Sequence, residues 1–269
     1  MMSDVSLSDK DFYQYKELLY SIAGIDLSIA KKSLVSGRLT KRLKATGLTS
    51  YGEYFQLLVG GNQPDEMQTA IDLLTTNETY FFREPKHFNF LRDTVLPNHP
   101  MRSQFRVWSA ASSSGQETYS IAMMLAEYMG GQLWEIVGSD ISMRVLDKAR
   151  NGNYPIAQAK HIQSEWLAKY CLKGVGSEEG NFLINPKLRS RIVFKQVNLN
   201  LVLPDLGQFD LVFLRNIMIY FDNETKQQVM SRIVGKMKSG AYLMIGHSET
   251  LNGITNSLDA VAPSIYRKP

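Results

Sequence analysis

Hydrophobic positions over residues 8–96 follow the spacing of amphipathic helices. In the first helix they recur every three or four residues, at Phe12, Tyr15, Leu19 and Ile22. Ser8 and Asp11 are typical of a capping box at its start, and Gly24 is suited to end it. Three further helical patterns cover residues 31–47, 54–58 and 64–74. Together they predict an N-terminal helical domain over residues 1–90.

From about residue 104 the pattern changes to short apolar runs that end in polar or small residues: FRVW, WEIVGSD, RIVFKQVN, FDLVFLRN and AYLMIG. Helical patterns lie between most of them, over residues 119–129, 143–149 and 224–237. Strands that alternate with helices predict an α/β domain over residues 91–269 with a doubly wound, mainly parallel sheet. The polar, glycine-bearing stretch over residues 170–194 fits less well. We interpret it as a small antiparallel β-subdomain inserted before the fourth core strand.

Composition narrows the class of protein. The 269 residues are 44% hydrophobic and 21% charged, which is typical of a globular protein, and the net charge of +4 favours an acidic partner. The single cysteine excludes a disulfide framework, and the four histidines lack metal-ligand spacing, so we expect no metal. The N-terminus has no apolar signal core, and no run approaches the ~18 apolar residues that span a bilayer. We therefore expect a cytoplasmic protein that does not insert into the membrane.

Polar or small residues follow four of the predicted strands. The first strand ends in the loop AASSSG over residues 110–115, with Glu117 just beyond it. The other three runs end in Asp140, in Asn198, and in Arg215 followed by Asn216. Ligands of open α/β sheets bind beyond the carboxyl ends of the strands, near the point where the strand order reverses. We therefore expect these side chains to form one site.

The small-residue loop favours a nucleoside ligand without phosphate. Asp140 lies roughly 25 residues after Gly115, near the spacing at which an acid binds ribose hydroxyls in dinucleotide-binding folds. The loop lacks the G-x-G-x-x-G pattern, so adenosine with an amino-acid tail, S-adenosylmethionine, fits better than a pyrophosphate. Taken alone, the serines are better explained as a helix cap, whereas Asp140 suits a cap about as well as ribose binding. Asn198 and Asn216 are suited to turns. Four such residues at successive strand ends favour the nucleoside site.

Longer motifs carry a family resemblance. LLTTNETYFFRE, WSAASSSGQETYSIA, GSDIS, VNL, FDLVFLRNIMIYFD and GHSET strongly resemble the bacterial chemotaxis receptor methyltransferases, the CheR family, in order and over nearly the whole chain. The resemblance implies an N-terminal helical domain and a Rossmann-like, S-adenosylmethionine-dependent methyltransferase domain with a small β-subdomain. It also implies methylation of glutamate side chains on the cytoplasmic helices of chemoreceptors.

The family's cofactor motifs fall on particular residues of this chain. The cofactor-binding set that the resemblance implies is Asn77, Thr79, Arg83, Glu117, Asp140, Asn198, Leu199, Arg215 and Asn216. Glu117 would take polar groups of the methionine part, Asp140 the ribose hydroxyls and Asn198 the adenine edge. Gln116 and Thr118 depart from the family's loop, and Leu214 stands where a cysteine is common. None of these departures changes the set.

Methylating a carboxylate needs little acid–base help. A glutamate has a pKa of ~4.3, so the nucleophile is already ionised at neutral pH, and we assign no general base. In-line placement, worth up to ~7–11 kcal/mol in well-oriented systems, is then the main task. Arg83 and Tyr220 are the candidates for steering the carboxylate or the cofactor tail, although Tyr220 beside Phe221 equally suits a core position.

Two segments predict receptor contacts. Residues 31–47 carry six basic residues and no acidic one, which suits an acidic receptor helix, although a solvated face is the commoner role of such runs. The glycine-bearing loop of the β-subdomain resembles that of family members that tether to a receptor's C-terminal peptide by strand addition. A nucleic-acid methyltransferase is disfavoured, because no proline follows Asn216 and aromatic and basic residues are not interleaved. A non-catalytic cofactor sensor is the other alternative.

Overall fold

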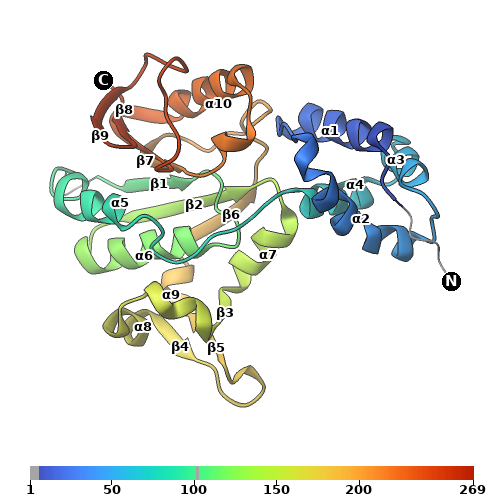
Figure 1. Cartoon of the computed structure of the whole chain (residues 1–269). Helices are drawn as coiled ribbons and strands as arrows, with labels where there is room; N and C mark the ends of the chain where they lie inside the picture. The colour runs from blue at the N-terminus through green and yellow to red at the C-terminus, as the bar shows by residue number, and fades with distance from the viewer. Residues whose placement is uncertain (1–5, 101–102) are drawn as a thin grey trace.

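The computed structural model describes residues 6–100 and 103–269. Its N-terminal part is a bundle of the helices α1 (Asp9–Ala23), α2 (Lys32–Thr46), α3 (Tyr51–Val59) and α4 (Pro64–Leu74), with a 3-10 turn, η1 (Ile29–Lys31), before α2 (Figure 1). Ser8 accepts a hydrogen bond from the Asp11 amide at 3.0 Å, and Gly24 takes the left-handed conformation that ends α1. The bundle ends at Leu74, before the expected boundary at residue 90, because the helices that follow pack on the sheet.

The large sheet has the strand order β6-β2-β1-β7-β8-β10-β9. Its strands are β1 (Phe105–Ser109), β2 (Trp134–Asp140), β6 (Ile192–Gln196), β7 (Phe209–Leu214), β8 (Met237–Ile245), β9 (Asp259–Ala262) and β10 (Ile265–Arg267). The first five in this order are parallel, and β10 pairs antiparallel with β8 and β9. The strand order reverses between β1 and β7. The predicted doubly wound α/β fold is therefore confirmed, whereas the short strands β9 and β10 carry no pattern that the sequence analysis detects.

Helices cover both faces of the sheet (Figure 1). The helix α10 (Asn223–Gly235) lies on one face, and α5 (Pro85–Phe90), the π-helix η2 (Leu91–Val95) and α6 (Gln116–Tyr128) lie on the other. Trp108 of β1 joins a core cluster that contains α10 and the N-terminal bundle, and its neighbour Val107 joins the cluster of α5 and α6. Successive residues of a buried strand thus serve opposite faces. The bundle shares one apolar core with the sheet, which fixes it against the strand ends.

A second, smaller sheet of three antiparallel strands has the order β3-β5-β4. It comprises β3 (Asn153–Pro155), β4 (Cys171–Lys173) and β5 (Asn181–Ile184), with η3 (Ile156–His161), α8 (Ser164–Tyr170), η4 (Gly176–Glu178) and α9 (Pro186–Arg189) around it. The β4–β5 hairpin agrees with the expected β-subdomain. The insertion starts earlier than residue 170, however, since β3 follows α7 (Met143–Asn151) directly. The run RIVF is β6 of the large sheet, because it pairs with β2 rather than with the hairpin.

The N-terminal bundle meets the carboxyl ends of the strands at the end of α1. Ile25 forms a β-bridge with Phe221, which follows β7 and the turn η5 (Met218–Tyr220). A Cβ at Gly24 would lie 2.6 Å from Thr225 of α10, so a side chain there would push the two parts apart. Within residues 6–100 and 103–269, no helix is long and apolar enough to cross a membrane.

Candidate cofactor and substrate cavity

A cavity of about 620 Å³ opens at the carboxyl ends of β1, β2, β6 and β7. Residues of the N-terminal bundle and of the segment 75–83 line it together with the strand ends. Every site residue expected from the sequence lines this cavity: Asn77, Thr79, Arg83, Glu117, Asp140, Asn198, Leu199, Arg215, Asn216 and Tyr220. The volume is typical of a small-molecule site, at ~300–1,000 Å³. The structure thus brings the whole predicted set together at the point where the strand order reverses.

Close packing explains the small residues of the loop after β1. A Cβ at Gly115 would lie 2.9 Å from both Ala149 and the Tyr154 hydroxyl, and the Gly115 backbone has φ +94°. Ser113 has φ +47°; its hydroxyl donates to the Asn77 carbonyl at 2.7 Å. The loop therefore passes between the segment 75–83 and α7 with no room for larger side chains.

Asp140 ends β2 as a buried carboxylate. Its Oδ2 accepts a hydrogen bond from the Ser113 amide at 2.9 Å, and its Oδ1 accepts one from the Ser142 amide at 3.0 Å. Burial raises the pKa of Asp140 to about 6, although these amides act to lower it. A carboxylate has about four acceptor positions, so Asp140 keeps acceptor capacity for hydroxyl groups in the cavity beside these amides. The carboxylate thus organises the local backbone and stays able to bind a ligand.

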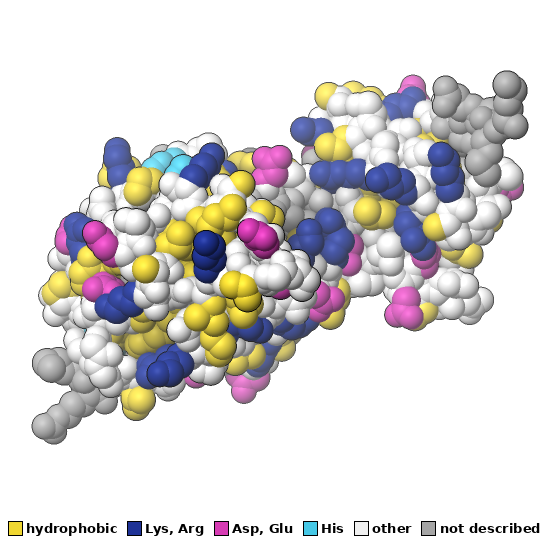
Figure 2. Space-filling model, turned by 90° about the horizontal axis from the view of Figure 1, so that it is seen from below, with side chains coloured by type: hydrophobic (Ala, Val, Ile, Leu, Met, Phe, Trp, Pro, Cys, Tyr) yellow, Lys and Arg dark blue, Asp and Glu magenta, His cyan; other side chains and the backbone are white. Residues whose placement is uncertain are grey.

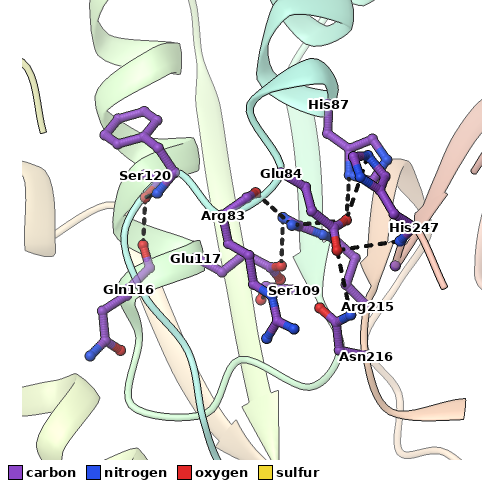
Figure 3. A network of polar contacts seen from close by, with 12 residues as sticks. Arg83, Glu84, His87, Ser109, Gln116, Glu117, Ser120, Arg215, Asn216 and His247 are labelled. Carbon is purple, nitrogen blue, oxygen red and sulfur yellow. Dashed lines mark hydrogen bonds and ion pairs between the residues drawn. The ribbon is translucent and has the colours of Figure 1, made fainter. Parts of the chain in front are cut away.

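Arg215, at the end of β7, lies between two carboxylates (Figure 3). Its Nη1 is 3.2 Å from Glu117 Oε2, and its Nη2 is 3.2 Å from Glu84 Oε2. Nη2 also donates to the Arg83 carbonyl at 2.5 Å. Burial raises the pKa of Glu117, and Arg215 and the Ser109 hydroxyl act against that rise. Two backbone segments distant in sequence are therefore joined by one buried guanidinium.

Backbone strain concentrates around this network. Among the described residues, the non-glycine residues with positive φ are Phe82, Glu84, Ser113, Asn216 and Ser264. Glu84, Ser113 and Asn216 belong to the segments that form the cavity or carry its charged groups. Such conformations are unfavourable by about 1–3 kcal/mol each, and they persist only where surrounding contacts hold them. Strain of this kind is typical of a functional site.

Glu249 is a partly buried carboxylate that the sequence analysis does not single out. It accepts hydrogen bonds from the amides of Gly246, Asn216 and Met218, at 2.6, 2.9 and 2.8 Å. A Cβ at Gly246 would lie 2.8 Å from this carboxylate. Glu249 therefore ties the loop after β8 to the loop after β7. Its place in the GHSET motif is the signal that points to it, since the motif's function is otherwise unassigned.

Glu84, His87 and His247 form a further cluster behind the cavity. One ligand atom of each lies within 4.8 Å of the others, a spacing that would suit a metal ion. Glu84 Oε2 is 3.5 Å from His87 Nδ1 and 3.9 Å from His247 Nε2. Burial, and then the charge of Arg215, lowers the pKa of His87 to about 3. The sequence does not predict this cluster, because His247 lies far along the chain from Glu84 and His87.

The other expected residues have partners that qualify their roles. Asn198 donates to the Ile22 carbonyl at 2.6 Å and accepts from the Asn200 amide at 2.9 Å, so its amide also joins the N-terminal bundle to the sheet. Arg83 donates to the Glu78 carbonyl at 3.2 Å and stays partly exposed. Tyr220 is partly buried and packs against the core, and it also lines the cavity. Its position therefore agrees both with a core role and with a place in the site.

The N-terminal bundle contributes two cations to the cavity lining, Lys31 and Arg38. Arg38 donates to the carbonyls of Leu74 and Thr75 at 2.9 and 3.1 Å. The sequence predicted a receptor contact for the basic run, and sequence spacing could not place two of its members at the cavity. For Arg38, the contact between α2 and the end of α4 does so.

Known proteins match the chain along almost its full length. The family model described as "CheR methyltransferase, all-alpha domain" matches residues 10–75, and "CheR methyltransferase, SAM binding domain" matches residues 77–266. The "Chemotaxis protein methyltransferase" of Escherichia coli is 38% identical over 273 residues, which cover 99% of this chain and 93% of that protein. "Chemotaxis protein methyltransferase 1" of Pseudomonas aeruginosa is 37% identical, covering 98% and 99%. The protein of that type in Borreliella burgdorferi is 36% identical, covering 98% and 96%.

Proposed function

Because the chain belongs to the CheR methyltransferase family, we propose that it methylates glutamate side chains of chemoreceptors with S-adenosylmethionine. The products are glutamate methyl esters and S-adenosylhomocysteine. The observation that carries the proposal is the meeting of the predicted residues in one cavity at the strand-order reversal. No described helix could span a membrane, which is compatible with an enzyme that reaches the cytoplasmic part of its receptors.

The donor set of the cavity fits this cofactor. Asp140 has acceptor positions for the ribose hydroxyls, and Glu117 offers a carboxylate for the amino group of the methionine end. Arg215 lines the cavity, and its Nε is buried without a hydrogen-bond acceptor among the described residues, so it suits an anionic group such as the cofactor carboxylate. Asn198, Leu199 and Asn216 complete the wall. When bound, S-adenosylmethionine supplies a methyl group on a positively charged sulfur that is its own leaving group.

The chain's part in the reaction is placement of the incoming carboxylate. Among the described residues that line the cavity there is no histidine, in keeping with a nucleophile that is already ionised. Arg83 and Tyr220 would steer the carboxylate, with the charges of Lys31 and Arg38 drawing it toward the opening. A bound substrate that excludes water from the cavity would favour this reaction, because opposite charges neutralise each other in it.

A methyl-transfer assay tests the proposed function. Purified protein, labelled cofactor and receptor membranes should yield label that alkali releases, because carboxyl esters hydrolyse and N-methyl groups do not. The variant Asp140→Ala should transfer much less label at limiting cofactor. Alkali-stable label on nucleic acid would identify the rival nucleic-acid activity. Cofactor binding without transfer to any receptor would identify a sensor.

The exposed basic face of α2 is the proposed contact for the receptor helix. Figure 2 shows Lys and Arg side chains gathered on the N-terminal bundle, on the side from which the small sheet is also seen. Arg42 is engaged internally, because it forms two hydrogen bonds with Glu66 at 2.8 and 2.5 Å. Lys41 and Lys44 are exposed. The docking role therefore rests on these lysines rather than on the arginines of the same helix.

The open edge of β4 is the proposed tether for a receptor C-terminal peptide. β4 pairs with β5 on one side only, and Leu172 and Val175 next to that edge are 47% and 77% exposed. A Cβ at Gly174 would lie 2.0 Å from the Glu178 carbonyl, so this tight loop requires glycine. An extended peptide would gain backbone hydrogen bonds at such an edge.

Titration of receptor C-terminal peptides tests this tether. Binding by wild type that is lost in Lys173→Pro, with cofactor affinity unchanged, is the expected result. The Gly174 amide bonds to Asn181 of β5, so the neighbouring Lys173 amide faces the open edge, and proline removes that donor. The edge lies away from the cavity. If no peptide binds while receptors are methylated normally, the small sheet is a scaffold.

A further inference from the structure

The buried guanidinium of Arg215 has two carboxylate partners, but only one of them faces the cavity. Glu117 lines the cavity, whereas Glu84 stands behind Arg215 on the segment that leads into α5 (Figure 3). The two contacts are equal in length, at 3.2 Å each. With both carboxylates ionised, these three groups carry two negative charges and one positive charge, so one negative charge is left over within the trio; Arg83, whose charge also favours the ionised form of Glu117, lines the cavity as well.

The position of the left-over charge depends on Glu84. Without Glu84, Arg215 would be paired with Glu117 alone, and the two charges would cancel at the cavity wall. With Glu84 present, Arg215 is shared, so the Glu117 carboxylate retains net negative character toward the cavity. A cationic group entering a buried site gains most from a carboxylate that is not already neutralised.

We propose that Glu84 is a positioning residue: by sharing Arg215, it keeps Glu117 free to bind the ammonium group of the cofactor. This inference rests on the proposed function, which places the methionine end of S-adenosylmethionine beside Glu117. Glu84 touches neither cofactor nor substrate, and it acts through Arg215.

The surroundings of Glu84 hold its charge in place. Its Oε1 accepts a hydrogen bond from the His247 amide at 3.3 Å and from Asn216 Nδ2 at 3.4 Å. Burial acts to raise the pKa of Glu84, yet Arg215 and the His247 amide hold that pKa below its ordinary value. His87 beside it is neutral, as its lowered pKa requires. A metal ion at this cluster would meet the guanidinium 3.2 Å from Glu84 Oε2, so the cation of the cluster is Arg215 itself.

Calorimetry with two ligands tests the proposal. S-adenosylhomocysteine carries the ammonium group, and 5′-methylthioadenosine has the same nucleoside without the amino-acid tail. Glu84→Gln preserves the shape and removes the charge. It should weaken S-adenosylhomocysteine about tenfold, a change typical of one charged hydrogen bond, and leave methylthioadenosine within about twofold. Glu84→Asp should retain most of the affinity. Glu127→Gln removes the charge of a partly exposed carboxylate that pairs with Lys169 at the far end of α6; it is the control and should change neither affinity.

A double variant separates the charge effect from a structural one. If Glu84 acts through Glu117, Glu84→Gln adds little once Glu117→Gln is present, since coupled residues are not additive. Additive losses, or equal weakening of both ligands by Glu84→Gln, would overturn the inference. If Glu117→Gln alone leaves S-adenosylhomocysteine affinity unchanged, the proposed role of Glu117 fails as well. If Glu84→Gln does not fold, Glu84→Asp and Glu84→Asn, which share one length and differ in charge, replace it in the same comparison.

Discussion

The N-terminal bundle and the carboxyl edge of the large sheet are built in opposite ways. In the bundle, local rules are obeyed: Ser50 and Glu53 form a capping box at the start of α3, and α1 and α2 end at Gly24 and Gly47 in the left-handed conformation. At the sheet edge, Glu84 and other non-glycine residues take left-handed conformations, and charged groups are buried. The bundle is stabilised by its local sequence, whereas the edge is held by contacts between distant segments.

This difference separates scaffold from site. A sequence that obeys the local rules for caps and backbone conformation everywhere gains stability. Residues that break these rules persist where function requires them. Here the departures surround the cavity. Substitutions should therefore affect folding and methylation together at the sheet edge. In the bundle they should affect folding alone, except at the residues that line the cavity and at the exposed lysines of α2.

The strongest test compares two arginines. Arg215→Leu should lower the free energy of unfolding by about 3–5 kcal/mol and abolish methylation, because Glu84 and Glu117 lose a buried counter-charge. The Arg42 side chain is 29% exposed against 1% for Arg215, and Glu66 keeps a hydrogen bond from the Tyr54 hydroxyl, so Arg42→Leu should lower it by only about 1–3 kcal/mol. Urea denaturation measures both. Equal decreases in the free energy of unfolding would mean that the carboxylates at the sheet edge depend on their arginine no more than Glu66 of the bundle does.

Asp140 sharpens the comparison through pH. Its pKa is about 6 in the folded protein against 3.8 ordinarily, so folding favours its protonated form. Its contribution to stability is therefore largest at low pH and is lost as pH rises through about 6. Cofactor binding should show the reverse, because the ionised carboxylate is the better acceptor for ribose hydroxyls.

Calorimetry at several pH values checks this expectation for Asp140. S-adenosylhomocysteine affinity should fall as pH drops from 7.5 to 5, and Asp140→Asn should flatten that dependence. At pH 7.5, Asp140→Ala should cost about 1–3 kcal/mol of binding free energy. A pH dependence unchanged in Asp140→Asn would place the titrating group elsewhere, for example at Glu117, whose pKa burial also raises.

The sequence predicts the framework of this molecule well, because periodicity and caps are local signals. It places the doubly wound sheet, the N-terminal helices and the residues at four strand ends. It does not place Glu84 and Glu249, whose roles depend on amides and a guanidinium far along the chain. Nor does it find β3, since a strand of three residues has too few positions to show alternation. Contacts between segments far apart in the sequence arise only when the chain folds, so local sequence patterns cannot predict them.

Exposed lysines of α2 offer a smaller test on the bundle side. The double reversal Lys41→Glu with Lys44→Glu should raise the apparent KM for receptor about 2–10-fold, since exposed ion pairs contribute ~0.2–1 kcal/mol each. Cofactor affinity should not change. The effect should fade with added salt, because the Debye length is ~8 Å at physiological ionic strength. Reversal of Lys148 and Lys195, exposed on the other domain, is the control. Equal KM values for both double variants would leave α2 as a solvated face.

The smallest effect is expected at the capping box of α3. Ser50 accepts a hydrogen bond from the Glu53 amide at 3.1 Å, and Ser50→Ala should lower the free energy of unfolding by about 1 kcal/mol. Methylation and cofactor affinity should stay at wild-type values, because this contact is local to the bundle. Ser113→Ala removes a hydroxyl of the same kind, but one that joins the cavity loop to Asn77. It should weaken cofactor binding severalfold with a similar loss of stability, of about 1 kcal/mol. If both serine variants bind cofactor equally well, a single hydroxyl group at the cavity matters no more for binding than one in the bundle. The difference between the two regions would then not hold for single hydrogen bonds.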